Sequence, residues 1–137
     1  MADVFDQMIG RIRKIIDSGL DADAAMRVLE ILEAPYVSKD ILEKARLYSE
    51  TLPKAEQQPF SPAQRYLHFL WDAFDKLPLC LIVPFSIPFR RLVAERLFAG
   101  CGRAFVCEEN VRFNFGQFLH VGDNVFFNRN VFLDTKG

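Results

Sequence analysis

The segment from Cys101 to Gly137 carries a regular alternation of apolar and polar positions. Apolar residues recur there at every sixth position, in two interleaved sets whose members all have odd numbers. The sets are Phe115, Val121, Phe127 and Leu133, and Cys101, Cys107, Phe113, Leu119, Val125 and Val131. On extended chain, odd-numbered side chains share one face. This period predicts a parallel β-helix of about 18 residues per coil, in which short strands stack on equivalent strands of the next coil.

Small or turn-favouring residues directly follow inward apolar positions in this register. They are Gly116, Gly122, Asn128 and Asp134. Such residue types tolerate the tight backbone of a corner, where a β-branched side chain would be strained. We therefore expect these four positions to lie at corners. Glu108 and Glu109 interrupt the apolar register and indicate a further corner or loop.

Residues 1–53 have the periodicity of three short amphipathic helices. A stripe from Val4 to Ile16 ends at Ser18-Gly19, and a second helix can be capped by Asp21 or Asp23 and stops before Pro35. The third helix should start at Ser38, with a shared inward face. That face consists of Ile41, Leu42, Ala45, Tyr48 and Leu52. The pattern predicts a small helical bundle, which is either a partner-binding module or a cap packed on the C-terminal part.

Residues 54–100 should connect this bundle to the repeat. Lys54 to Phe60 is polar and forms a linker, and Ser61 then caps a helix with Gln64 at the capping-box position. This helix has an aromatic stripe typical of a core, and His68 is expected at its surface or boundary.

Three prolines interrupt the apolar run from Leu77 to Phe89. We expect an extended strap along the β-helix or a neighbouring subunit, because the run is too short to span a membrane. Arg90-Arg91 follows at once, so peripheral membrane contact through residues 77–91 is an alternative. The final helix should run from Phe89 to Phe98 and close at Gly100.

Composition narrows the function classes. The chain has 17 basic and 18 acidic residues that are interspersed, which does not favour a nucleic-acid surface. The three cysteines lie among apolar neighbours, which indicates buried thiols in a reducing cytosol. The start of the chain is amphipathic and unlike a signal peptide, so the predicted location is cytoplasmic. Neither a Cys-x-x-Cys motif nor a histidine cluster suggests a metal site.

The repeat resembles a known family in several stretches. The run from Asn114 to Asn124, the strand Phe126 to Asn130 and Leu133-Asp134 are similar to the maltose and galactoside O-acetyltransferase branch of the hexapeptide-repeat acyltransferases. The lead-in from Arg91 to Gly102 resembles the helix and glycine turn before the family's β-helix. The resemblance implies a left-handed β-helix, a homotrimer, and transfer of an acyl group from acyl-CoA, usually acetyl-CoA, to a hydroxyl of a sugar-like acceptor.

The resemblance also implies acceptor-binding residues. Asn114 falls where the family has an aspartate that contacts the acceptor, and Asn128 matches its pocket asparagine. Asp134 comes one residue sooner after Asn128 than in the sugar-acetylating branch. For each of the three, the alternative is a polar corner residue that bonds to backbone groups at the strand ends.

The family's general base is a histidine that would lie beyond Gly137. His120 is the only histidine in the repeat, but its even number points it outward, so we expect it to have no catalytic role. With room for about two coils, we expect the chain to be incomplete and catalytically silent as it stands.

The sequence thus predicts an α+β fold. It comprises a helical bundle at 1–53, a linker with helices and strap at 54–100, and the start of a left-handed parallel β-helix at 101–137. The predicted function is O-acyl transfer, with acyl-CoA as co-substrate and no metal. The alternative is a non-catalytic oligomerisation or partner-binding module. A metal hydratase on the same β-helix would need several inward histidines.

Overall fold

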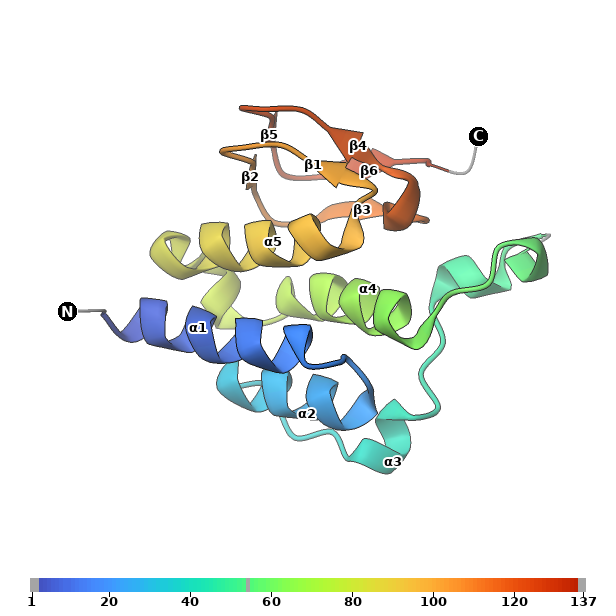
Figure 1. Cartoon of the computed structure of the whole chain (residues 1–137), viewed down its shortest axis with the longest axis horizontal. Coiled ribbons are helices and arrows are strands. Elements are labelled where there is room, and N and C mark those ends of the chain that lie inside the picture. Colours follow the sequence, from blue (N-terminus) through green and yellow to red (C-terminus); the bar gives the residue numbers. More distant parts are fainter. Residues whose placement is uncertain (1–2, 54, 136–137) are drawn as a thin grey trace.

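The first two helices begin at acidic caps. The computed structural model describes residues 3–53 and 55–135 (Figure 1). Helix α1 (Val4–Asp17) is capped by Asp3, whose carboxylate accepts from the Asp6 amide at 2.8 Å. Helix α2 (Ala22–Ile31) is capped in the same way by Asp21. The stripe of α2 is buried, as predicted, and so are Ile9, Ile12 and Ile16 in α1, whereas Val4 at the start of the α1 stripe is 60% exposed.

The third predicted helix is wrong beyond its first turn. Helix α3 (Lys39–Leu42) is a single turn capped by Ser38, and it buries only Leu42. The side chain of Ile41 is 64% exposed and that of Tyr48 is 88% exposed. The chain leaves the helix at Glu43 and forms separate 3-10 turns, η1 (Tyr48–Thr51) and η2 (Ala55–Gln57). The apparent period therefore spans two elements.

Helix α4 (Pro62–Phe74) starts with the predicted capping box between Ser61 and Gln64. Its aromatic stripe is buried, and the Trp71 indole Nε1 donates to the Val111 carbonyl at 2.7 Å. This bond ties α4 directly to the strands that follow.

The expected strap at 77–89 is a helix instead. After the 3-10 turn η3 (Pro78–Leu81), helix α5 (Val83–Leu97) contains both Pro84 and Pro88. Pro84 lies in the first turn, where its missing N–H is not needed. Pro88 removes one helical hydrogen bond, but Phe85 and Phe89 are fully buried against Phe74. Aromatic burial thus offsets the lost bond, and the last helix begins at Val83, not Phe89.

The strands form three two-stranded parallel sheets. Strands β1 (Gly100–Cys101), β2 (Val106–Cys107) and β3 (Val111–Phe113) pair with β4 (His120–Val121), β5 (Phe126–Phe127) and β6 (Val131–Leu133), respectively. The register joins Cys101 to Val121, Cys107 to Phe127 and Phe113 to Leu133, a constant offset of 20 residues.

This offset corrects the expected coil of about 18 residues. The 3-10 turn η4 (Gly116–Phe118) lengthens the third side, so the apolar register shifts by two positions between coils. The two interleaved sets in the sequence correspond to two inward positions on each segment: Val125 and Phe127 flank the outward Phe126, and Val131 and Leu133 flank the outward Phe132. The odd-numbered side chains still share the inner face, as predicted.

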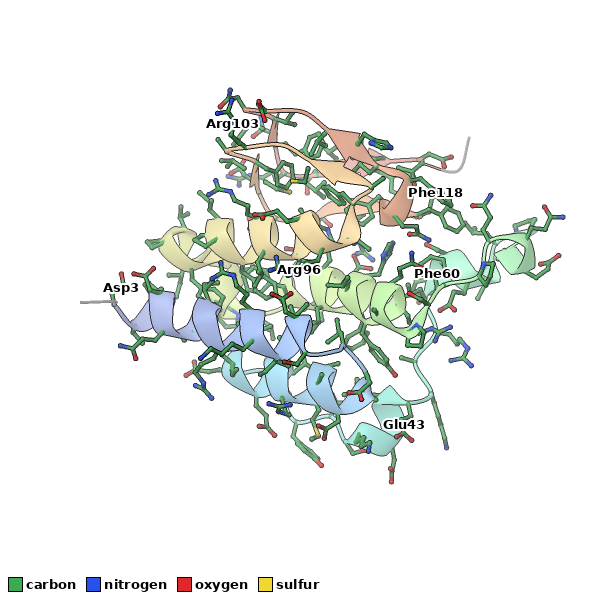
Figure 2. The ribbon with its side chains drawn as sticks, in the orientation of Figure 1. Asp3, Glu43, Phe60, Arg96, Arg103 and Phe118 are labelled. Atoms are coloured by element: carbon green, nitrogen blue, oxygen red, sulfur yellow. The ribbon has the colours of Figure 1, made fainter. Side chains whose placement is uncertain are left out.

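Corners stack from coil to coil. Gly116, Gly122, Asn128 and Asp134 lie outside the strands, as predicted. The left-handed residues lie two positions after the first residue of each corner. Their φ values are 58° at Ala104 and 59° at Asn124 for one pair of stacked corners, and 57° at Asn110 and 63° at Asn130 for the next pair. The first corners approach closely, because a Cβ on Gly102 would lie 2.4 Å from the Gly122 carbonyl carbon. Arg103 and Phe118 mark opposite ends of the strand layer (Figure 2).

The elements form successive layers, with α1 and α2 on one side, α4 and α5 in the middle and the strands on the other side (Figure 1). One hydrophobic core continues through them from Ile9 to Phe113. Arg90 is buried and its guanidinium pairs with Asp75 at 2.7 Å, while Arg91 donates to the Phe105 carbonyl. The basic pair therefore does not present two free cations to a membrane. Within 3–53 and 55–135, no helix has the length and apolarity needed to cross a bilayer.

Candidate functional site

A polar cluster occupies the corner after β3 and β6. The Asn114 Nδ2 donates to Asp134 Oδ1 at 2.8 Å, and Asn114 Oδ1 accepts from the Thr135 amide at 2.9 Å. The Thr135 hydroxyl bonds to backbone groups of Phe115. We call Asn114, Asp134 and Thr135 the corner cluster. It satisfies backbone groups at the strand ends, and it also places an amide and a carboxylate side by side.

Asn128 lies elsewhere. It follows β5 and is exposed at the corner between β5 and β6, beside Arg129, which pairs with Glu108 at 3.3 Å. Of the three predicted acceptor residues, the structure thus brings Asn114 and Asp134 together and leaves Asn128 at a different corner of the same chain.

A cavity of about 370 Å³ lies where the turn η1 meets the strand layer, and we call it the seam cavity. Segment 47–52 forms one wall, α4 another, and β3 with β6 the third. The lining residues are Leu47, Tyr48, Ser49, Leu52, His68, Asp72, Arg112, Phe113, Asn114 and Phe132. Asn114 therefore belongs both to the corner cluster and to this cavity. The volume is within the range of small-molecule sites.

His68 is buried, so its predicted surface position is wrong. Its side chain is 3% exposed and lies edge-on between the rings of Phe60 and Phe113. Helix α4 is covered on two sides, by the first helices and by the strands, which buries positions beyond its main stripe. The apolar periodicity of the sequence identifies only one of these two buried faces of α4.

The protonation state of His68 follows from its surroundings. The Gly116 amide donates to His68 Nε2 at 3.0 Å, so the proton of the neutral ring is on Nδ1. Desolvation lowers the pKa of His68 to about 4, with Glu50 opposing the shift. The ring is therefore neutral near pH 7. Its Nδ1 has no hydrogen-bond partner among the described residues.

An ion pair forms the polar side of the cavity. Arg112 Nε lies 2.8 Å from Asp72 Oδ1, and both side chains are partly exposed. Burial raises the pKa of Asp72, and the Arg112 charge opposes this. Periodicity in the sequence does not relate these two residues, because they come from α4 and β3, far apart in the chain.

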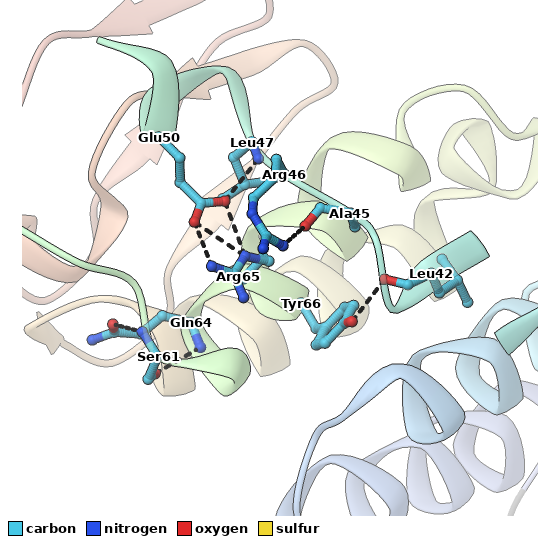
Figure 3. A network of polar contacts seen from close by, with 9 residues as sticks. All are labelled: Leu42, Ala45, Arg46, Leu47, Glu50, Ser61, Gln64, Arg65 and Tyr66. Atoms are coloured by element: carbon cyan, nitrogen blue, oxygen red, sulfur yellow. Dashed lines mark hydrogen bonds and ion pairs between the residues drawn. The ribbon is translucent and has the colours of Figure 1, made fainter. Parts of the chain in front are cut away.

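The wall at 47–52 is held by a network around Glu50 (Figure 3). Arg65 Nε donates to Glu50 Oε2 at 2.9 Å, and the Leu47 amide donates to the same oxygen at 2.8 Å. The hydrogen bonds from Arg65 are the main reason that the pKa of Glu50 is lowered. The Tyr66 hydroxyl also donates to the Leu42 carbonyl at 2.7 Å. The Arg65 bonds fix the wall to α4, and the Tyr66 bond ties α3 to the same helix.

Other candidates do not join this site. His120 is exposed on β4, where its Nδ1 would lie 3.1 Å from a Cβ placed on Gly100. Cys80 and Cys107 are buried free thiols, and burial raises the pKa of Cys107 to about 12. Across 3–53 and 55–135, no group of three or more His, Cys, Asp or Glu side chains is arranged to hold a metal ion.

Comparison with protein-family models, curated proteins and solved structures found no match. The seam cavity and the corner cluster are therefore the structural basis for assigning a function.

Proposed function

We propose that residues 100–135 are the first coils of a left-handed parallel β-helix and that the protein is an acyltransferase of the hexapeptide-repeat type. It would transfer an acyl group, most simply acetyl, from acyl-CoA to a hydroxyl of a sugar-like acceptor. The observation that carries this proposal is the set of three parallel strand pairs with one 20-residue offset. The polar corner cluster at the third corner supplies hydrogen-bonding groups suited to an acceptor.

The proposed chemistry is attack of an acceptor hydroxyl oxygen on the thioester carbonyl carbon. The hydroxyl proton goes to a general base, and the carbon–sulfur bond breaks to release CoA. In this scheme Asn114 and Asp134 hydrogen-bond to the acceptor. We assign the role of general base to neither His68 nor His120. His68 is buried with Nε2 engaged by Gly116, and His120 lies on a different side of the coil from the corner cluster.

A homotrimer would complete the acceptor site. In a trimer, the corner that carries Asn128 can face the corner cluster of a neighbouring subunit, which reunites the three predicted residues. Two outward aromatic side chains away from the seam cavity support assembly. Phe118 and Phe126 are 46% and 56% exposed, whereas Phe132, which is 64% exposed, lines the seam cavity. Such rings are costly to leave in water. We expect light scattering to give a trimer, and a stable monomer at micromolar concentration would contradict it.

The same exposed aromatic rings favour a second candidate, a non-catalytic oligomerisation module. The two proposals differ in whether acyl-CoA is consumed. A module would form the trimer without releasing thiol from acetyl-CoA.

The experiment is to incubate acetyl-CoA and a panel of sugars with a form that continues past Gly137, and to follow free CoA thiol and acetylated sugar. We expect turnover that falls at least tenfold in both Asn114→Ala and Asn128→Ala, since each removes hydrogen bonds to the acceptor. Arg103→Ala, at the opposite end of the strand layer, is the matched control and should retain full turnover. Absence of turnover, or turnover insensitive to both asparagine substitutions, would contradict the proposal.

A further inference from the structure

The seam cavity has features of a ligand site that lies entirely within one chain. Its walls come from segment 47–52, α4 and β3 with β6, so no neighbouring subunit is needed to form it. It shares Asn114 with the corner cluster, but the rest of its lining lies outside that cluster. It can therefore be tested without reference to acyl transfer.

The lining selects against charged ligands. Asp72 and Arg112 neutralise each other at 2.8 Å, and His68 is neutral. The remaining wall is mainly apolar, with Leu52, Phe113 and Phe132 contributing aliphatic and aromatic surface. A ligand with a net charge would lose hydration without gaining an opposite charge here. An apolar body, in contrast, would gain from leaving water.

His68, which lines the cavity, carries one buried hydrogen-bond donor that has no partner among the described residues. His68 is 3% exposed, and its Nε2 is occupied by the Gly116 amide, so Nδ1–H is the free donor. No described residue accepts from it. A buried donor without a partner is unfavourable, and an incoming oxygen atom would relieve that cost.

We propose that the seam cavity binds an uncharged small molecule with an apolar body and a carbonyl or ether oxygen that accepts a hydrogen bond from His68 Nδ1–H. The oxygen sets the orientation of the ligand, and Leu52, Phe113 and Phe132 hold its apolar part. Segment 47–52 forms the outer wall, positioned by the bonds from Arg65 and Leu47 to Glu50.

The probes are acetophenone, which has an acceptor oxygen on an aryl body, ethylbenzene, which lacks the oxygen, and benzoate, which adds a charge. Dissociation constants are measured with the full chain by ligand-observed NMR. We expect acetophenone to bind about tenfold more tightly than ethylbenzene, because one hydrogen bond separates them. Benzoate should bind most weakly. Equal affinity for acetophenone and ethylbenzene would overturn the proposal.

Two variants locate the effect. His68→Gln places an amide group where Nε2 bonds to Gly116 but removes the Nδ1 donor. The affinity for acetophenone should therefore fall to the affinity for ethylbenzene. Leu52→Trp fills the cavity and should weaken both ligands at least tenfold. Val83→Trp, in the groove between α5 and β2, is the matched control and should change neither. Should His68→Gln fail to fold, Leu52→Trp decides: unchanged binding of both ligands in that variant would overturn the proposal.

Discussion

Two joints connect the helices to the strand layer, and they are built differently. At the first, Trp71, Phe98, Phe105 and Phe113 pack ring against ring, with centroids 5.2–5.8 Å apart. We call it the aromatic joint. At the second, the seam, a 3-10 turn meets the same layer across a cavity of about 370 Å³ lined by apolar side chains and by the Asp72–Arg112 ion pair. The comparison indicates that the aromatic joint provides stability, whereas the seam is available for binding.

The largest expected effect comes from breaking the aromatic joint. Phe105 is fully buried and contacts Phe98 and Phe127. Phe105→Ala should lower the free energy of unfolding by about 3 to 5 kcal/mol, through lost burial and a residual cavity. Urea denaturation measures this. At the seam, Tyr48→Ala is the control, and its exposed ring should contribute less than about 0.5 kcal/mol. If both variants lowered the free energy of unfolding by similar amounts, the contrast between the aromatic joint and the seam would be contradicted.

The next largest effect is the pH dependence from His68. Its pKa is lowered from the model-compound value of 6.5 to about 4 in the folded chain. The unfolded state therefore binds more protons between these values, and stability rises with pH across this window. This contribution is fully present above pH 6.5 and is lost as the pH falls toward 4, by about 3 kcal/mol in total. Denaturation at several pH values measures the loss.

His68→Gln is the matched variant for this effect, since glutamine does not titrate. Its stability should change less between pH 6.5 and 4 than that of the wild-type chain. If stability changed equally with pH in the two proteins, His68 would not be the group responsible for the pH dependence.

The smallest expected effect is on the wall of the seam. Glu50→Gln weakens the charge-assisted bonds from Arg65 and should cost about 1 kcal/mol of stability, because the pair is only partly buried. Hydrogen exchange should accelerate at the Leu47 amide, which bonds to Glu50, and remain unchanged at Val111, whose carbonyl accepts from Trp71 of the aromatic joint. Lys39→Gln, which removes an exposed ion pair with Glu43, is the control. Unchanged exchange at Leu47 would contradict a role for Glu50 in holding the wall.

Local signals in the sequence were sufficient for much of the fold. The predicted caps at Asp21 and Ser61 start helices because a side-chain oxygen can bond to a free amide, which depends only on neighbouring residues. The alternation of side chains along a strand also depends only on neighbouring residues, and it places Cys107 and Phe113 inward. The α+β class and the parallel stacking of a six-residue pattern follow from these features.

Long-range contacts could not be predicted in this way. The η4 turn lengthens the coil from the expected 18 or so residues to 20, and the six-residue apolar period does not reveal this because both sets of apolar positions continue through the turn. The burial of His68 depends on layers from both sides of α4. The pairs Asp72–Arg112 and Glu50–Arg65, which shape the seam, join residues that periodicity does not relate.

A map of backbone amide shifts in the full chain tests the contrast between the two joints most directly. Acetophenone is titrated into the ¹⁵N-labelled protein, and the shifted amide signals are assigned. We predict shifts concentrated at segment 47–52, at His68 and along β3 and β6 near Arg112 and Phe132. Shifts concentrated instead around Phe98 and Phe105, or spread evenly over the chain, would contradict the assignment of binding to the seam.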